Sequence, residues 1–281
     1  MFIEITKFIL YSGLIVLISK YILVSTLRKL AENLELKPKI VGNITGYATS
    51  IPELLTITIS SIKGLLATSI FNILSSNIIN FLQYMASIII NKNRKELSNK
   101  AIKIDIVLVL ITILIPVFLI WKNIELNLTI VPIFMILYLL FYYLNNNAHK
   151  IYLNKEEKEI EKQIIYEEEN LKGNTRKTVL YILILIGTGF LLYVIGELLG
   201  NTLDNLCNYF KISEVVIGIL LGFITSLPEL ITFFESQKYY KKQNENKLLG
   251  VVEATNNLLT SNITNLFIIQ AIGIIVYTIF C

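Results

Sequence analysis

The stretch GYATSIPELLT, residues 46–56, places a proline and a glutamate side by side inside an apolar segment. The same pattern returns as GFITSLPELIT at residues 222–232. Proline cannot donate a backbone hydrogen bond, and its ring pushes on the carbonyl four residues back, so Pro52 and Pro228 each interrupt a helix. Inside a membrane, the released carbonyls and the neighbouring carboxylates would need a polar partner.

The rest of the chain has the composition of an integral membrane protein. Of 281 residues, 54% are hydrophobic, and the mean hydropathy is +0.64, which is high for a soluble domain. A helix needs about 20 apolar residues to cross about 30 Å of hydrocarbon. We therefore predict an all-α polytopic membrane protein, with an uncleaved first span because the N-terminus lacks a basic opening and a small-residue cleavage site. Eight spans are expected, near residues 6–26, 39–61, 65–90, 103–121, 127–144, 178–200, 213–235 and 249–279.

Lysines and arginines gather in alternate loops. Groups of four or more follow the first, third, fifth and seventh spans, whereas the other loops carry single lysines, Lys63, Lys122 and Lys211. The positive-inside rule then places both termini outside, in a prokaryotic cytoplasmic membrane. The net charge of +4 reflects this topology. The expected partners are membrane lipids rather than nucleic acid, with the chain as a monomer or homodimer.

The two proline-containing spans are related by a shift of 176 residues. Six positions are identical at this offset and, because they follow steps of four and three, they share one helical face. They are Gly42, Gly46, Thr49, Glu53, Thr56 and Ser60, matched by Gly218, Gly222, Thr225, Glu229, Thr232 and Ser236.

The spans that follow also match. NILSSNIIN at 72–80 corresponds to NLLTSNITN at 257–265. Five spans precede the second copy, so the halves insert with opposite orientation, as in secondary transporters whose substrate sites lie near the midplane. Close helix packing alone would explain the glycines but not the two glutamates. We divide the chain into a first repeat, a charged cytoplasmic connector and a second repeat, at residues 1–144, 145–177 and 178–281.

Two glutamates that meet in a membrane repel each other and are poorly solvated. Protonation is one remedy, and a cation that neutralises both is another. Hydroxyls, amide oxygens and free carbonyls nearby make an all-oxygen site, which suits Ca²⁺, or Na⁺ at lower charge, better than zinc or copper.

TSxPEL followed by SNxxN, in two copies, resembles the α-repeats of the cation/calcium exchanger superfamily, the sodium/calcium exchangers and their microbial relatives. The resemblance covers about residues 8–90 and 180–275. It implies alternating-access antiport of Na⁺ and Ca²⁺, with no enzymatic activity and no organic cofactor, and with the first and sixth spans as a sliding gate. By position, Glu53 and Glu229 would be the bidentate Ca²⁺ ligands. The residues expected to complete the ion positions are Gly46, Thr49, Ser50, Ser76, Asn80, Gly222, Thr225, Ser226, Ser261 and Asn265.

The chain departs from the family pattern in three ways. Asn265 stands where microbial members usually carry aspartate, which leaves two carboxylates and puts a 3:1 stoichiometry in doubt. Several expected glycines are replaced, by Ala48, Phe71, Ser75, Asn256 and Thr260. The chain has 5 + 3 spans, whereas the family typically has ten. A Ca²⁺/H⁺ antiporter and a degenerate, non-transporting subunit of the same fold therefore stay open as alternatives.

The remaining charged residues have weaker interpretations. Lys20 and Glu197 occupy related positions before the two motifs, where they either pair between the gate helices or form local contacts near a span end; we favour the second. Asp105 and Glu253 lie at span edges and are expected to be interfacial, and His149 to be solvated. The connector is expected to be a solvated link rather than a regulatory calcium-binding loop.

Overall fold

The structure, a computed structural model, describes residues 2–34, 36, 38–122, 124, 126–152, 175–242 and 247–281. Within these ranges the regular structure is entirely helical. In chain order the elements are α1 (Phe2–Ile18), η1 (Ser19–Val24), α2 (Ser25–Asn33), α3 (Pro38–Thr49), α4 (Ile51–Ile62), α5 (Leu66–Ile90), η2 (Arg94–Ser98), α6 (Lys100–Trp121), η3 (Leu128–Ile130), α7 (Val131–Tyr152), α9 (Thr175–Asp204), η4 (Asn205–Tyr209), α10 (Glu214–Thr225), α11 (Leu227–Lys242), α12 (Lys247–Ile263), η5 (Thr264–Ile269) and α13 (Gln270–Phe280). The segments η1, η4 and η5 are π-helical, a geometry that is frequent at functional sites.

Seven helices of the described ranges are long and apolar enough to cross a membrane. They coincide with seven of the eight predicted spans, so the chain is a multi-pass membrane protein. The remaining predicted span, 39–61, forms two 12-residue helices, α3 and α4. The first helix ends at Thr49 and the second begins at Ile51, next to Pro52. The segment also carries the glycines, hydroxyls and glutamate of the motif.

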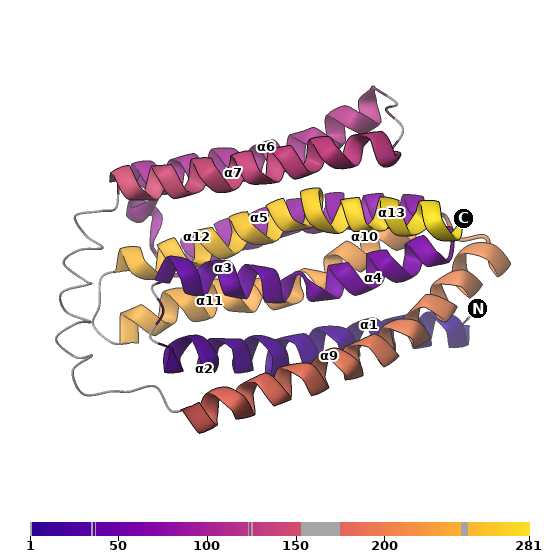
Figure 1. Ribbon diagram of the computed structural model, residues 1–281, viewed down its shortest axis with the longest axis horizontal. Coiled ribbons are helices and arrows are strands. Elements are labelled where there is room, and N and C mark those ends of the chain that lie inside the picture. The colour runs from indigo at the N-terminus through magenta and orange to yellow at the C-terminus, as the bar shows by residue number, and fades with distance from the viewer. Residues whose placement is uncertain are drawn as a thin grey trace.

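The helices form three layers (Figure 1). The middle layer contains α3, α4, α5, α10, α11, α12 and α13, and the α6–α7 pair covers one side of it. On the other side α1 and α2 pack along α9. In Figure 1, α3 and α4 run in the opposite direction to α10 and α11, and the two chain termini lie at the same end of the molecule.

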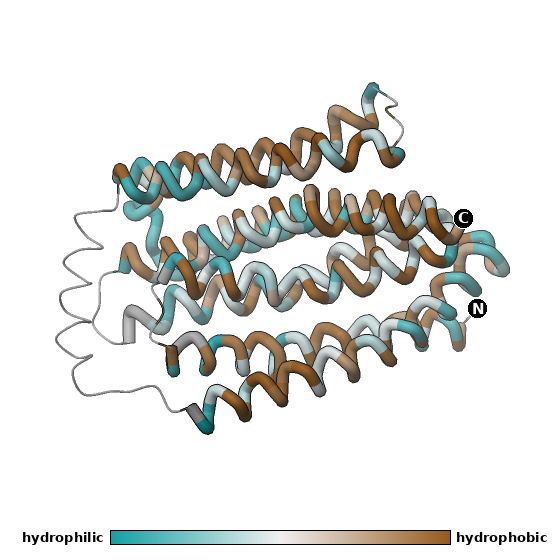
Figure 2. Tube along the Cα trace, viewed as in Figure 1, coloured by the Kyte–Doolittle hydropathy of each residue, from teal (hydrophilic) through white to brown (hydrophobic). Residues whose placement is uncertain are grey.

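Apolar packing joins these layers. Phe267 of η5 contacts two rings of α7, Phe134 and Phe141, at centroid distances of 5.8 and 5.2 Å. A second apolar cluster connects α1 and α9 with α10. The outer surfaces of α6, α7 and α9 expose large hydrophobic side chains, as lipid-facing helices do. Figure 2 shows these helices as mostly hydrophobic, with hydrophilic residues at the helix ends and within the middle layer.

The predicted connector, 145–177, overlaps the helices on either side of it. Helix α7 continues to Tyr152 and α9 begins at Thr175. The part of this prediction that concerns residues 153–174 lies outside the described residues.

Candidate cation-binding site

Both proline-containing motifs form a break between two short helices. Ser50 separates α3 from α4, with φ −81° and ψ −1°, and Ser226 separates α10 from α11, with φ −79° and ψ −3°. Each new helix begins just before the proline, whose missing N–H is harmless in a first turn. Glu53 and Glu229 therefore lie in the first turns of α4 and α11. The positive end of the helix dipole favours a carboxylate at that position.

Glycines let each motif helix approach the other half of the chain. A Cβ on Gly46 of α3 would lie 2.8 Å from the Asn257 carbonyl oxygen of α12, and one on Gly222 of α10 would lie 2.6 Å from the Asn72 carbonyl oxygen of α5. These contacts are equivalent under the repeat. Each TSxPEL helix thus packs on the SNxxN helix of the other half.

The two glutamates are fully buried, at 0% exposure each, and close enough for their charges to interact. The Ser261 hydroxyl donates to Glu229 Oε1 at 3.0 Å. Within the described part of the chain, Glu229 Oε2 and both Glu53 oxygens receive no hydrogen bond. Burying a carboxylate without a partner is costly. A proton or a cation would relieve that cost.

The asparagines of α5 and α12 form reciprocal hydrogen bonds between the halves. Asn77 Nδ2 donates to the Asn262 carbonyl and Asn262 Nδ2 to the Asn77 carbonyl, both at 3.2 Å. Asn80 and Asn265 donate to the side-chain oxygens of Asn262 and Asn77, both at 3.3 Å. The NH₂ groups of Asn80 and Asn265 are used in this way. Their side-chain oxygens remain, and neither oxygen accepts a hydrogen bond from the described residues.

Hydroxyl groups lie between the asparagines and the glutamates. Ser50 and Ser261 are 3.0 Å apart, Oγ to Oγ. Ser50 also donates to the Gly46 carbonyl at 2.9 Å, and Ser226 to the Gly222 carbonyl at 2.7 Å. These two carbonyls, predicted as ion ligands, are therefore engaged by serine hydroxyls here.

All twelve residues predicted for the site are buried. They are Gly46, Thr49, Ser50, Glu53, Ser76, Asn80, Gly222, Thr225, Ser226, Glu229, Ser261 and Asn265. Among the described residues, no group of three or more His, Cys, Asp or Glu side chains is arranged to hold a metal. The atoms that could bind a metal are oxygens, and the two ionised glutamates give the site a formal charge of −2. The oxygens that lack a partner among the described residues fit a hard cation such as Ca²⁺ or Na⁺.

Comparison with known proteins agrees with this chemistry. A family model described as sodium/calcium exchanger protein matches residues 5–146 and 180–280. The chain belongs to the sodium/calcium exchanger family. Two solved structures of the sodium-calcium exchanger NCX_Mj share its fold: one soaked with 10 mM Na⁺ and zero Ca²⁺ (22% identity, TM-score 0.54) and one soaked with 100 mM Na⁺ and 10 mM Sr²⁺ (21% identity, TM-score 0.53). Each alignment covers 98% of this chain, and 84% and 83% of the respective NCX_Mj chain. Among curated proteins, no sequence matches.

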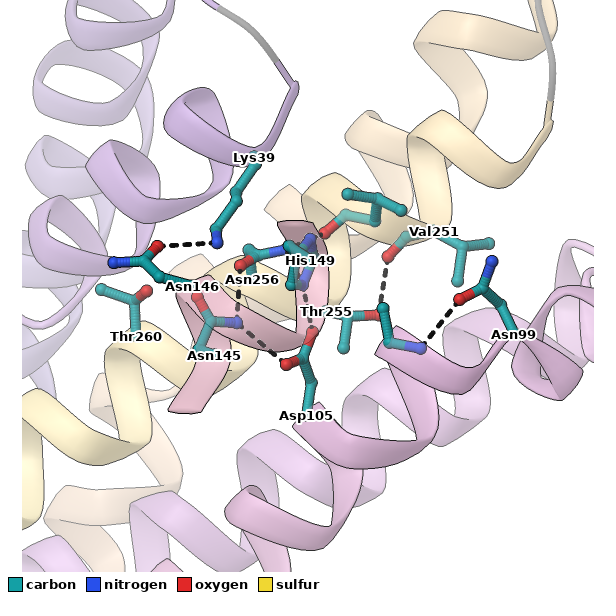
Figure 3. A network of polar contacts seen from close by, with 12 residues as sticks. Lys39, Asn99, Asp105, Asn145, Asn146, His149, Val251, Thr255, Asn256 and Thr260 are labelled. Atoms are coloured by element: carbon teal, nitrogen blue, oxygen red, sulfur yellow. Dashed lines mark hydrogen bonds and ion pairs between the residues drawn. The ribbon is translucent and has the colours of Figure 1, made fainter. Parts of the chain in front are cut away.

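The structure also contains a buried polar network that the sequence did not predict (Figure 3). His149 Nε2 of α7 lies 2.7 Å from Asp105 Oδ2 of α6. Asn145 donates to Asp105 Oδ1 at 2.9 Å and to the Asn256 side chain of α12 at 3.2 Å. The expectations of a solvated His149 and an interfacial Asp105 are wrong, since both are buried. Helix α7 extends beyond the predicted span, and His149 packs against α6 and α12 instead of entering a loop.

The expectation of an interfacial Glu253 is also wrong. Its side chain is 1% exposed. It accepts a hydrogen bond from Ser236 at 2.5 Å and lies 3.4 Å from Arg28 Nη2. Lys20 forms a local contact with the Tyr21 hydroxyl at 2.8 Å, as the favoured interpretation expects, and Glu197 is exposed.

Proposed function

We propose that this protein is a secondary active antiporter that exchanges Na⁺ for Ca²⁺ across the membrane by alternating access. The observation that carries the proposal is the fully buried pair Glu53 and Glu229, three of whose carboxylate oxygens accept no hydrogen bond from the described residues. Two negative charges match one Ca²⁺ or two Na⁺. The same site can therefore hold one Ca²⁺ or two Na⁺, but not both at once. Such alternative occupancy of one site is the requirement for exchange.

In this proposal the two glutamates bind Ca²⁺ directly. The side-chain oxygens of Asn80 and Asn265 line the same centre, and hydroxyls complete the Ca²⁺ and flanking Na⁺ positions, from Ser50, Ser76, Ser226 and Ser261. Thr225 lies beside Glu53 and Thr49 beside Glu229. The carbonyls of Gly46 and Gly222 become ligands when the serine hydroxyls that bond to them turn toward the ion.

The transport mechanism uses two inverted halves. The opposite directions of α3–α4 and α10–α11 support this arrangement. The ends of α2, α5, α7 and α11, where the described part of the chain carries basic residues, lie at the end of the molecule opposite the termini. By the positive-inside rule that end faces the cytoplasm and both termini face outside. Exchange by NCX_Mj, described in its structures as extracellular ion exchange, gives a model for the reaction here.

The decisive experiment neutralises the two carboxylates separately. We expect Glu53→Gln and Glu229→Gln each to abolish Na⁺-gradient-driven ⁴⁵Ca²⁺ uptake in proteoliposomes, because a single carboxylate cannot balance Ca²⁺ in a buried site. Glu235→Gln is the matched control, since Glu235 is an exposed residue on the same helix as Glu229. Undiminished uptake by either site variant would rule the mechanism out.

A Ca²⁺/H⁺ antiporter is the second candidate. The observation that favours it is Glu53, whose two oxygens have no donor within the described residues and would be satisfied by a proton. Ca²⁺ uptake driven by a pH gradient, in the absence of Na⁺, would decide for this alternative. A non-transporting subunit would show neither flux, and calorimetric titration would detect no binding of Ca²⁺ or Na⁺.

A further inference from the structure

A cavity lies between the α6–α7 pair and the middle layer. Its volume is about 420 Å³, which is within the range of small-molecule sites, roughly 300–1,000 Å³. Its walls come from α5, α6, α7, η5 and α13, together with the segment between α6 and η3. No residue assigned to the candidate cation site lines it. The cavity is therefore a separate feature of the molecule.

The cavity runs from an exposed mouth to a buried floor. At the mouth, Ile120 and Ile124 are 40% and 44% exposed, and Asn127 is exposed as well. The floor is formed by the buried residues Ile73, Pro116, Phe134, Leu266 and Gln270. Because Ile120 lies on the outer surface of α6, which faces lipid, a molecule dissolved in the bilayer can reach the mouth directly.

The position of α6 shows which membrane surface the mouth is near. The helix ends at Trp121, which is 70% exposed. Tryptophan is enriched where the hydrocarbon meets the lipid headgroups. This end of α6 lies at the same end of the molecule as the two chain termini (Figure 1). The mouth therefore opens in the membrane leaflet on the side of the termini.

The walls select for an uncharged ligand. Of the described residues that line the cavity, all except Asn127, Gln270 and Tyr277 are apolar, and none is charged. A charged ligand would lose its solvation there without gaining a counter-ion, which is costly. The cavity thus suits a molecule that is neutral and mostly apolar.

Gln270 adds a requirement for one polar group. Its side chain is 2% exposed, and its Nε2 atom donates to no group within the described residues. A buried N–H without an acceptor destabilises the protein, so an acceptor on a bound molecule would be favoured. A water molecule needs two to four polar partners and fits this floor poorly, because Gln270 is the only polar residue among those described there.

We propose that this cavity is a binding site for a neutral lipid that carries a carbonyl group. The carbonyl oxygen accepts a hydrogen bond from Gln270 Nε2 at the floor, and the apolar tail extends toward Ile120 and Ile124 at the mouth. The lipid enters from the bilayer. The site does not depend on whether the protein exchanges ions.

A pair of probes tests the hydrogen bond. Methyl octanoate and undecane have the same number of non-hydrogen atoms, but only the ester carries a carbonyl. Each is titrated, as a mole fraction of the lipid, into nanodiscs that contain the protein, and binding is followed as a rise in the unfolding temperature. We expect the unsubstituted protein to reach its half-maximal rise at about fivefold less ester than alkane, as one neutral hydrogen bond gives.

Removal of the donor should abolish this preference. Gln270→Leu has a side chain of similar size without an N–H, so we expect it to bind the two probes equally. Gln83→Leu is the matched control, because Gln83 of α5 does not line the cavity, and the preference for the ester should persist in it. Equal binding of both probes to the unsubstituted protein, or a preference that survives in Gln270→Leu, would overturn the proposal.

A second variant tests the place of binding. Ile70 of α5 lines the cavity, and we expect Ile70→Phe to weaken the binding of both probes, since the larger side chain occupies their space. Leu82→Phe is the control, because Leu82 lies on the same helix and is 60% exposed. Undiminished binding of both probes to Ile70→Phe would reject the cavity as their site.

Discussion

Glu53 and Glu229 occupy equivalent positions but have different surroundings. Ser261 donates to Glu229, whereas its repeat equivalent, Ser76, donates to the carbonyl of Ile73 in its own helix. Glu53 therefore keeps two free oxygens and Glu229 keeps one, within the described residues. An ion entering the site in this conformation would meet Glu53 as its less engaged ligand.

His149 stabilises the contact between α6 and α7, through its bond to Asp105. We expect His149→Ala to destabilise the protein by about 3–5 kcal/mol, because it leaves the buried Asp105 without its basic partner. Thermal unfolding in detergent measures the change. Lys150→Ala is the control, since Lys150 is the next residue and is exposed. Equal unfolding temperatures for the two variants would contradict this role of His149.

The helices α3 and α10 show how bulky replacements in the family pattern are accommodated. A Cβ on Gly218 would lie 2.9 Å from Cβ of Phe71, and one on Gly42 would lie 3.0 Å from Cβ of Asn256. Phe71 and Asn256 stand where glycines were expected, and the glycine on the facing helix preserves the close approach. The loss of a glycine on one helix does not separate the pair.

Glycine on the motif helix should therefore be indispensable. We expect Gly46→Ala to destabilise the protein by about 1–3 kcal/mol and to reduce Ca²⁺ flux, because the methyl group meets backbone atoms of α12 that cannot turn aside. Gly187→Ala on α9 is the matched control, since a Cβ there has no neighbour within 4 Å. We expect Gly187→Ala to be stabilising, because alanine is favoured over glycine in a helix by about 1 kcal/mol. Flux and unfolding temperature equal to those of Gly187→Ala would contradict the close-contact argument.

Among the helices, the sequence predicted the features that depend on a local pattern of residues. Apolar runs predicted the spans, and the two motifs predicted the family and fold, both now confirmed. The burial of Asp105, His149 and Glu253 could not be predicted in the same way. His149 lies beyond its predicted span because α7 continues into polar sequence, where hydropathy alone would end the helix. Asp105 and Glu253 lie inside predicted spans, and their burial comes from contacts with α7 and with α11 and α2, which hydropathy does not reveal. The ion-ligand roles stay a prediction.

In the proposed antiporter, two carboxylates set the charge of the ion site. Asn265 supplies an amide where the family pattern has a third acid, so one Ca²⁺ or two Na⁺ would each leave that site neutral. We expect exchange to be electroneutral, with the initial rate of Ca²⁺ uptake unchanged by an imposed membrane potential. Asn265→Asp adds a third negative charge to the site, and its uptake should respond to the potential. A strong response in the unsubstituted protein would contradict the two-for-one balance.

The crossed amide bonds of Asn77 and Asn262 also constrain biosynthesis. The ribosome completes α5 long before α12 exists, and during that interval the α5 amides lie in the bilayer without their native acceptors. The nascent first half must be sheltered, by the insertion machinery or by lipid headgroups and water, until the second half arrives. We therefore expect α5 and α12 to dock late in maturation, once both amide pairs can form.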